Sequence, residues 1–173
     1  ESECQLLRCE YEQTGAYTIT LEQILFERPT ADRLREAFIA NLLHRSPGVI
    51  GKEFRLNGTR ADVVQFNGSS SAYEIKSARD KFSRLSKQLS FYSKVFEYTN
   101  VVCDGQPTHG ISEHVGVFEV RRIGEKLDFY QLRRPCLNEA IDPVEQLNLL
   151  RVRELSELVK ALGVRGKLSR SSM

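Results

Sequence analysis

The chain of 173 residues has no tryptophan, one methionine, three histidines and only four cysteines. These cysteines, Cys4, Cys9, Cys103 and Cys136, form no Cys-x-x-Cys pair and have no histidine at zinc spacing. We therefore favour buried or incidental thiols in a reducing cytoplasm, with a structural metal site as the alternative. No run of eighteen apolar residues occurs, so we expect no transmembrane helix and no membrane partner.

The N-terminal pattern and the distribution of charge bear on the cell compartment and on possible partners. The first residues lack a basic segment followed by an apolar one, so we expect no signal peptide and a cytoplasmic location. The net charge is only +2, but residues 1–30 hold six acids against two bases, and residues 151–173 hold six bases against two acids. A basic segment can contact phosphates, although charge runs are more often solvated faces, so this asymmetry alone decides nothing.

The length fits a single domain, 1–173, with a core of its own. We divide it into an N-terminal extension 1–30, a core 31–103, a C-terminal elaboration 104–162 and a basic tail 163–173.

Helix and strand patterns alternate along the core. After a weak strand or short helix around residues 17–26, Thr30 can cap a helix that runs to about His44. Three strand-like runs follow, separated by Asn-Gly pairs that are strong hairpin signals, so they predict an antiparallel meander. These runs are Val49–Leu56, Ala61–Phe66 and Ala72–Ser77.

The remaining pattern predicts a second helix, further strands and a last helix. The second helix should span Asp80–Phe96, and Asn100–Cys103 reads as a buried strand that pairs parallel with an earlier one. Two more strands are expected at Gly116–Val120 and Leu127–Leu132, and a helix from Asp142 to Leu162. The order gives an α/β fold in which helices sandwich a mixed sheet.

The residues most typical of a function are Asp62, Glu74 and Lys76. Two carboxylates and the backbone carbonyl of Ile75 offer oxygen ligands for Mg²⁺, and a lysine beside them can hold a water or a phosphate. This set predicts hydrolysis of a phosphodiester bond by a water that the metal activates. The bland interpretation is a surface Glu–Lys pair across a hairpin.

Strand register separates these interpretations. Glu74 and Lys76 are two residues apart and share a face of their strand. A two-residue turn at Asn67-Gly68 would place Asp62 opposite Tyr73, on the wrong face. A three-residue loop would place it opposite Glu74, so the metal site requires an odd loop or a bulge.

With these residues in this order, the chain resembles the PD-(D/E)XK superfamily of restriction-endonuclease-like nucleases. Its core is a helix, a three-stranded meander, a helix and a parallel strand. Asp62, Glu74 and Lys76 fall on its signature positions, and Ala61 stands at the loosely kept position of the proline. The run from Tyr73 to Ser77 with the helix after it is also similar to a family of bacterial and phage proteins within this superfamily, in which a later Leu-Leu-x-x-x-Glu-Leu helix is common.

The resemblance implies further roles. The RecB-like branch carries Gln-x-x-x-Tyr on the following helix, which matches Gln88, expected to be catalytic, and Tyr92, expected to contact substrate. It also often places a glutamate on the first helix near the metal, and Glu36 is the candidate. Arg84 and Lys81 are expected to contact phosphate. Each of these residues also has an ordinary structural explanation as a core or surface side chain.

The expected function is therefore that of a Mg²⁺-dependent nuclease in which Mn²⁺ can replace Mg²⁺. The resemblance favours DNA over RNA as the substrate and suggests a phage or mobile element, and a homodimer is possible. The alternative is a nucleic-acid-binding or protein-binding module that kept the fold without the activity. His44, His109 and His114 lie in no motif and are expected to be non-catalytic.

Overall fold

The computed structural model describes residues 29–105, 110–124 and 126–163. The expected element around residues 17–26, Cys4, Cys9, His109 and the basic tail beyond Gly163 lie outside this part of the chain. The elements in chain order are α3 (Ala31–Arg45), β1 (Val49–Leu56), β2 (Thr59–Phe66), β3 (Ser70–Lys76), the 3₁₀ helix η1 (Phe82–Arg84), α4 (Leu85–Tyr92), β4 (Tyr98–Cys103), β5 (Gly116–Ile123), β6 (Lys126–Arg133), α5 (Pro143–Leu147) and α6 (Val152–Ala161).

The six strands form one mixed sheet in the order β1-β2-β3-β4-β5-β6. The first three strands form the predicted antiparallel meander, β3 pairs parallel with β4, and β4 pairs parallel with β5. The last strand, β6, pairs antiparallel with β5. A parallel neighbour requires a crossover connection, which here contains η1 and α4. The α/β class and the mixed sheet are therefore confirmed.

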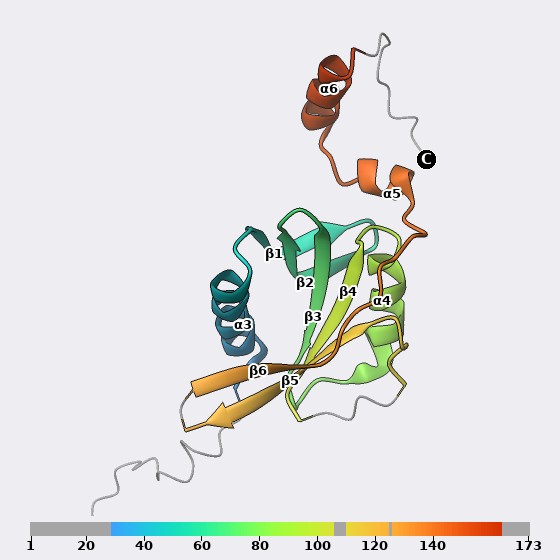
Figure 1. Ribbon diagram of the computed structural model, residues 1–173. Coiled ribbons are helices and arrows are strands. Elements are labelled where there is room, and N and C mark those ends of the chain that lie inside the picture. The colour runs from blue at the N-terminus through green and yellow to red at the C-terminus, as the bar shows by residue number, and fades with distance from the viewer. Residues whose placement is uncertain (1–28, 106–109, 125, 164–173) are drawn as a thin grey trace, which may run out of the picture.

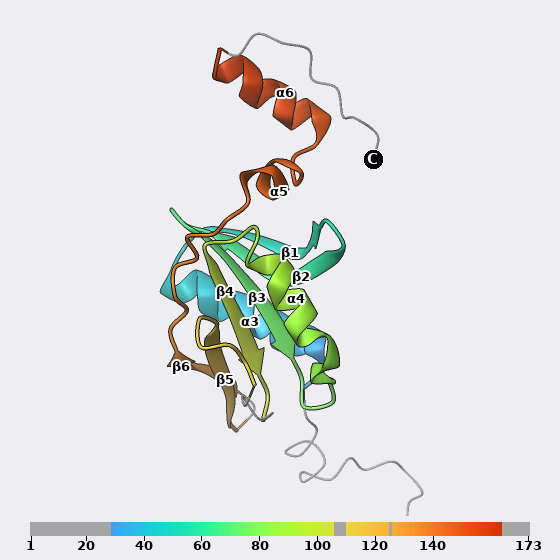
Figure 2. The same ribbon diagram turned by 90° about the vertical axis from the view of Figure 1, so that its right-hand side faces the viewer.

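The two faces of the sheet are covered by different helices, α3 on one and α4 on the other (Figures 1 and 2). The alternation of side chains along each strand divides the apolar core accordingly. Phe38 and Leu42 of α3 pack with Tyr73 and Ile75, whereas Leu89 of α4 packs in a second cluster. Since Glu74 and Lys76 alternate with Tyr73 and Ile75, they face the α4 side.

The helix predicted over Asp80–Phe96 is shorter in the structure. The Asp80 carboxylate accepts hydrogen bonds from the backbone and hydroxyl of Ser77, each 2.7 Å long, and this closes a loop before the helix begins. At the other end the chain turns after Tyr92, and Phe96 enters the core with only 1% of its surface exposed. The prediction is right about the element and wrong about both ends.

The single helix predicted from Asp142 to Leu162 is wrong, because the chain breaks between α5 and α6. Asp142 caps α5 as expected, accepting from Val144 N at 2.9 Å. A new helix then starts at Arg151, whose N–H donates to the Glu154 carboxylate at 2.7 Å. The break allows Leu149 to pack against the core on the α4 side of the sheet. Gln146 of α5 donates to the Val95 carbonyl at 2.8 Å, and α6 lies farther from the sheet (Figure 1).

Phe38 tests the α3 side of the core. It is completely buried, and its ring meets those of Tyr73, Phe118 and Phe129 edge to face at 5.1–5.4 Å. Phe38→Ala should lower the free energy of unfolding by about 3–5 kcal/mol, because it leaves a cavity. Leu43→Ala on the same helix, where 43% of the residue is exposed, should cost about 1 kcal/mol or less. Urea denaturation measures both, and equal losses would contradict this packing.

Candidate active site

The loop between β2 and β3 has the odd length that the metal site requires. Phe66 pairs with Ser70, so residues 67–69 form a three-residue loop. Gly68 has φ of 96°, a left-handed conformation that glycine adopts without strain. The register continues to Val63 opposite Tyr73, which places Asp62 at the level of Glu74. The condition set by the sequence is therefore met.

Beyond Val63 the two strands stop pairing, and Asp62 lies at this gap. Its Oδ2 accepts a hydrogen bond from the backbone N–H of Ile75 at 2.8 Å, so a side chain replaces the next backbone partner. Within a strand, the N–H and C=O of one residue point toward the same neighbouring strand. The carbonyl of Ile75 therefore faces the gap as well, on the side of Asp62.

Glu74 is held by three donors. Its Oε1 accepts from Lys76 Nζ at 2.8 Å and from Gln88 Nε2 at 2.6 Å, and its Oε2 accepts from the hydroxyl of Tyr92. Only 2% of Glu74 is exposed. Gln88 also accepts from Lys76 Nζ at 3.1 Å. The structure thus brings together Glu74, Lys76, Gln88 and Tyr92, as expected.

Tyr92 belongs both to the core and to this cluster. Its ring is fully buried, and its hydroxyl also lies 2.8 Å from the carbonyl oxygen of Arg60. Burial, together with the charge of Glu74, raises the pKa of the Tyr92 phenol far above its ordinary value. The phenol therefore stays protonated, and its single hydrogen is divided between Glu74 and the Arg60 carbonyl.

The electrostatics of Asp62 show how the site accommodates two acids. Burial first, and then the charge of Glu74, raise the pKa of Asp62 to about 6, against the lowering effects of the Ile75 hydrogen bond, Arg35 and Lys76. Ionisation of Asp62 therefore carries a free-energy cost that a bound cation would relieve.

This donor set fits Mg²⁺. The ion commonly binds one or two carboxylates and keeps several waters, so it needs no cage made by the protein alone. Among the described residues no group of three or more His, Cys, Asp or Glu side chains is placed to hold a metal. Asp62, Glu74 and the Ile75 carbonyl would thus be an open site with positions left for water and substrate.

Glu36 forms an ion pair with Lys52 and not with the site of Asp62 and Glu74. Its side chain is 60% exposed and pairs with Lys52 of β1, with Nζ at 2.6 Å from Oε1. Metal binding by Glu36 stays a prediction and would require this ion pair to open. Its neighbour Arg35 faces the site instead, with Nη2 at 4.0 Å from Asp62 Oδ1.

Arg35 and Glu53 are two residues of this region that the sequence did not indicate. The guanidinium of Arg35 meets Asp32 at 3.1 Å and Glu53 at 3.4 Å, and its buried Nε has no hydrogen-bond partner among the described residues. Glu53 of β1 lies opposite Asp62 of β2 in the strand register. Its φ is 47°, a left-handed conformation that is costly for glutamate. Neither residue belongs to a sequence motif. Their place near Asp62 results from contacts between segments that are distant in the chain.

The other expected residues lie at the edges. Lys81 and Arg84 are exposed before and at the start of α4, and neither forms an ion pair with a described residue. Their phosphate contacts stay a prediction. Burial raises the pKa of the Cys103 thiol to about 11, which agrees with an unreactive core side chain. No helix in the described part of the chain is long and apolar enough to cross a membrane.

These features define an α/β protein with a buried cluster of acidic and amide side chains at an opening in its sheet. The chain belongs to the family described as Bacteriophage P4 protein cII, whose model matches residues 31–173. It is 30% identical over 109 residues to Protein cII of Enterobacteria phage P4. That alignment covers 61% of this chain but 41% of the phage protein, so the chain spans well under half of that relative's length.

A solved structure is also similar. It is a protein of unknown function from Silicibacter pomeroyi, with a TM-score of 0.55 and 18% identity. The alignment covers 79% of this chain and 90% of the other. At this identity the likeness concerns the fold alone, and neither relative's name specifies an activity.

Asp62→Asn should change the pH dependence of stability. The pKa of Asp62 is about 6 in the folded protein against 3.8 for an ordinary aspartate. Below about pH 4 both states are protonated, but as the pH rises through 6 the folded state loses up to about 3 kcal/mol. Without divalent metal, the variant should therefore gain stability relative to wild type at about pH 8 and not at about pH 4.

Chemical denaturation at the two pH values measures this effect. Asp128→Asn is the control, since Asp128 lies on β6 and pairs with Arg45 at 3.8 Å, away from Glu74. The same difference between Asp62→Asn and wild type at both pH values would show that Asp62 is not under electrostatic strain.

Proposed function

We propose that this chain is a metal-dependent nuclease that hydrolyses phosphodiester bonds. The observation that carries the proposal is the meeting of Asp62, Glu74 and Lys76 where β2 and β3 separate, in a site where burial and the charge of Glu74 raise the pKa of Asp62. A protein that only binds a partner has no physical need for such a pair.

The order of elements supports the proposed membership of the PD-(D/E)XK superfamily. The helix α3, the meander β1-β2-β3, the helix α4 and the parallel strand β4 follow one another as in that core. The contacts of Gln88 and Tyr92 with Glu74 give the Gln-x-x-x-Tyr motif of the RecB-like branch a role in the same cluster.

In this proposal Asp62, Glu74 and the Ile75 carbonyl hold Mg²⁺ or Mn²⁺. The bound ion supplies positive charge that activates water and offsets the charge developing on the phosphate. Lys76 has three N–H donors and uses two of them on Glu74 and Gln88. The third is left for the attacking water or a phosphate oxygen. Gln88 orients Lys76 and Glu74, because it donates to the carboxylate and accepts from the ammonium.

Basic side chains around the site would bind the nucleic acid backbone. Lys81 and Arg84 are exposed by the start of α4, within the same segment as Gln88. Phosphate contacts position a strand but do not distinguish DNA from RNA. The preference for DNA therefore rests on the superfamily resemblance.

Cleavage assays test the function. With Mg²⁺ or Mn²⁺, wild type should cut single-stranded or double-stranded DNA faster than RNA of the same sequence. Lys76→Ala should lose on the order of a hundredfold or more in rate, as expected when a group that stabilises developing charge is removed. Lys126→Ala, which removes an exposed lysine on β6, should keep full activity. Binding of nucleic acid without any cleavage would favour the binding module instead.

Metal binding has a separate readout in thermal stability. Mg²⁺ at ten times its dissociation constant should stabilise wild type by about 1.4 kcal/mol. Asp62→Asn and Glu74→Gln should lose this gain. Glu36→Gln should also lose it if Glu36 is a metal ligand, and should keep it if Asp62, Glu74 and the Ile75 carbonyl hold the ion without Glu36. Melting curves with and without Mg²⁺ measure the effect, and an equal gain in all variants would place the ion elsewhere.

A further inference from the structure

Two arginines lie directly opposite each other on the hairpin of β1 and β2. The strand register pairs Arg55 of β1 with Arg60 of β2, and both residues are exposed. Directly opposed residues of an antiparallel pair share a face with Cβ atoms about 4.5–5.5 Å apart, and like charges in this position are destabilising. Because this arginine pair costs stability, the packing of the hairpin does not account for it.

The positive charge of the arginine pair is only partly balanced. Arg60 Nη2 lies 3.4 Å from Glu53 Oε1, and the same oxygen lies 3.4 Å from Arg35 Nη1. Both distances exceed the range of about 2.7–2.9 Å that is usual for charge-assisted hydrogen bonds. Glu53 is thus shared between two guanidinium groups and holds neither closely. Arg55 forms no ion pair with a residue in the described part of the chain.

The hairpin that carries the pair is fixed to α4. Gly58 in its turn has φ of 85°, and a Cβ at this position would lie 3.2 Å from Cζ of Phe91, so the turn packs closely on that ring. The carbonyl of Arg60 accepts from the hydroxyl of Tyr92 at 2.8 Å. These contacts hold the backbone of the hairpin against a helix, so the two arginines extend from a fixed surface.

The arginine pair also lies next to the proposed metal site. Arg60 comes two residues before Asp62 on β2, which is about 7 Å along a strand. Arg35 joins the two places, because its Nη1 contacts Glu53 and its Nη2 lies 4.0 Å from Asp62 Oδ1. One strand of DNA carries a phosphate for about every 3.4 Å of its axis. A strand with one phosphate at Asp62 therefore has a neighbouring phosphate within reach of Arg60.

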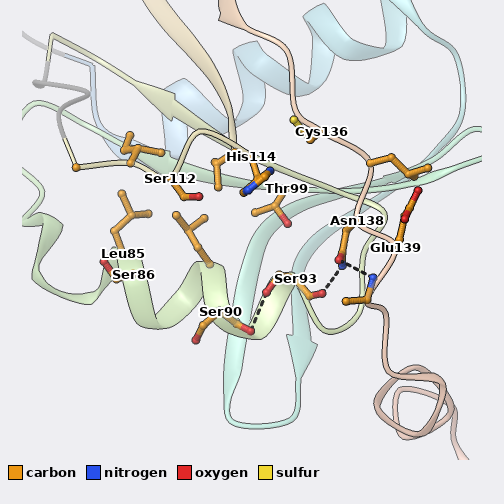
Figure 3. Close-up of a pocket in the computed structure, with 16 residues that line it drawn as sticks. Leu85, Ser86, Ser90, Ser93, Thr99, Ser112, His114, Cys136, Asn138 and Glu139 are labelled. Carbon is orange, nitrogen blue, oxygen red and sulfur yellow. Dashed lines mark hydrogen bonds between the residues drawn. The ribbon is translucent and has the colours of Figure 1, made fainter.

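Another side of α4 offers no such charge. A cavity of about 600 Å³ lies there, between α4, the chain before β5 and the chain after β6 (Figure 3). Leu85 and Leu89 line it, and none of its described lining residues is a lysine or an arginine. Glu139 adds a negative charge to the lining. A phosphate backbone therefore finds counter-charge at the hairpin and not in this cavity.

We propose that Arg55 and Arg60 together bind one backbone phosphate of a nucleic acid strand, in competition with the Glu53 carboxylate for Arg60. A guanidinium group presents its N–H donors in a planar fork that matches phosphate oxygens. The bound phosphate would also offset the repulsion between the two arginines. The choice of nucleic acid among phosphate compounds rests on the proposed nuclease function, whereas the opposed arginines are observed independently of it.

Binding of a labelled DNA oligonucleotide to the full chain, without divalent metal, tests the proposal. Fluorescence anisotropy gives the Kd at several KCl concentrations. Arg55→Gln and Arg60→Gln should each weaken binding about tenfold at low salt. The double variant should lose clearly less than the product of the two, because both arginines act on one phosphate. It should also reduce the slope of log Kd against log salt by about one.

Arg121→Gln is the matched control. It removes the same charge from β5, which lies on the other side of the sheet centre from β1 and β2. The Arg121 side chain is 51% exposed against 55% for Arg60, and it also pairs with a glutamate. This variant should bind the oligonucleotide as wild type does.

Glu53→Gln distinguishes a phosphate site from an ion-pair network that only supports the fold. Removal of the competing carboxylate should tighten binding up to about fivefold, the size of an exposed ion pair. This gain should shrink when Arg60→Gln is also present, because Arg60 is the group that Glu53 releases. Arg55→Gln should not lower the melting temperature, since it removes a like-charge contact. Weaker binding by Glu53→Gln would contradict the competition.

Two further results would overturn the proposal. One is an affinity of Arg55→Gln and Arg60→Gln equal to that of Arg121→Gln. The other is a double variant whose loss equals the product of the single losses, because the arginines would then act on separate phosphates. Cleavage by wild type combined with either result leaves the nuclease intact and removes this phosphate site. Binding that depends on both arginines, without any cleavage, keeps the site and removes the nuclease.

Discussion

The hydrogen bond from the Ile75 N–H to the Asp62 carboxylate is the contact on which the rest of the site depends. At this bond the backbone pairing of β2 with β3 ends, and the Asp62 carboxylate occupies the gap between the two strands. A three-residue loop sets the register that makes this contact available. A change of one residue in that loop would turn Asp62 to the other face of the sheet and separate it from Glu74.

Around this contact, Glu74 and Asp62 differ in how many hydrogen-bond donors hold their carboxylates. Glu74 is tied by Lys76, Gln88 and Tyr92, so its orientation is fixed. Asp62 has one backbone donor and a more distant arginine, and its pKa is raised. One rigid and one less constrained carboxylate would suit the proposed divalent ion, which has to leave room for a substrate. The left-handed Glu53 and the partly buried Arg35, whose Nε has no hydrogen-bond partner among the described residues, place backbone strain and an unsatisfied donor beside Asp62.

Much of this arrangement could be predicted from local sequence. Asn-Gly pairs gave the hairpins, strand alternation placed Glu74 with Lys76, and the helical repeat placed Gln88 above Tyr92. The break in the helix predicted from Asp142 to Leu162 could not be predicted, because it depends on the packing of Leu149 against a core formed by distant segments. Arg35 and Glu53 were missed for the same reason: their meaning lies in contacts between α3, β1 and β2.

The central claim, that Asp62 and Glu74 form a divalent metal site, is tested most directly by anomalous diffraction from crystals grown with Mn²⁺. An anomalous peak is expected within bonding distance of both carboxylates and of the Ile75 carbonyl, with Lys76 still bonded to Glu74. A crystal with full Mn²⁺ occupancy elsewhere, for example beside Glu36, and no peak in the gap between β2 and β3 would contradict it.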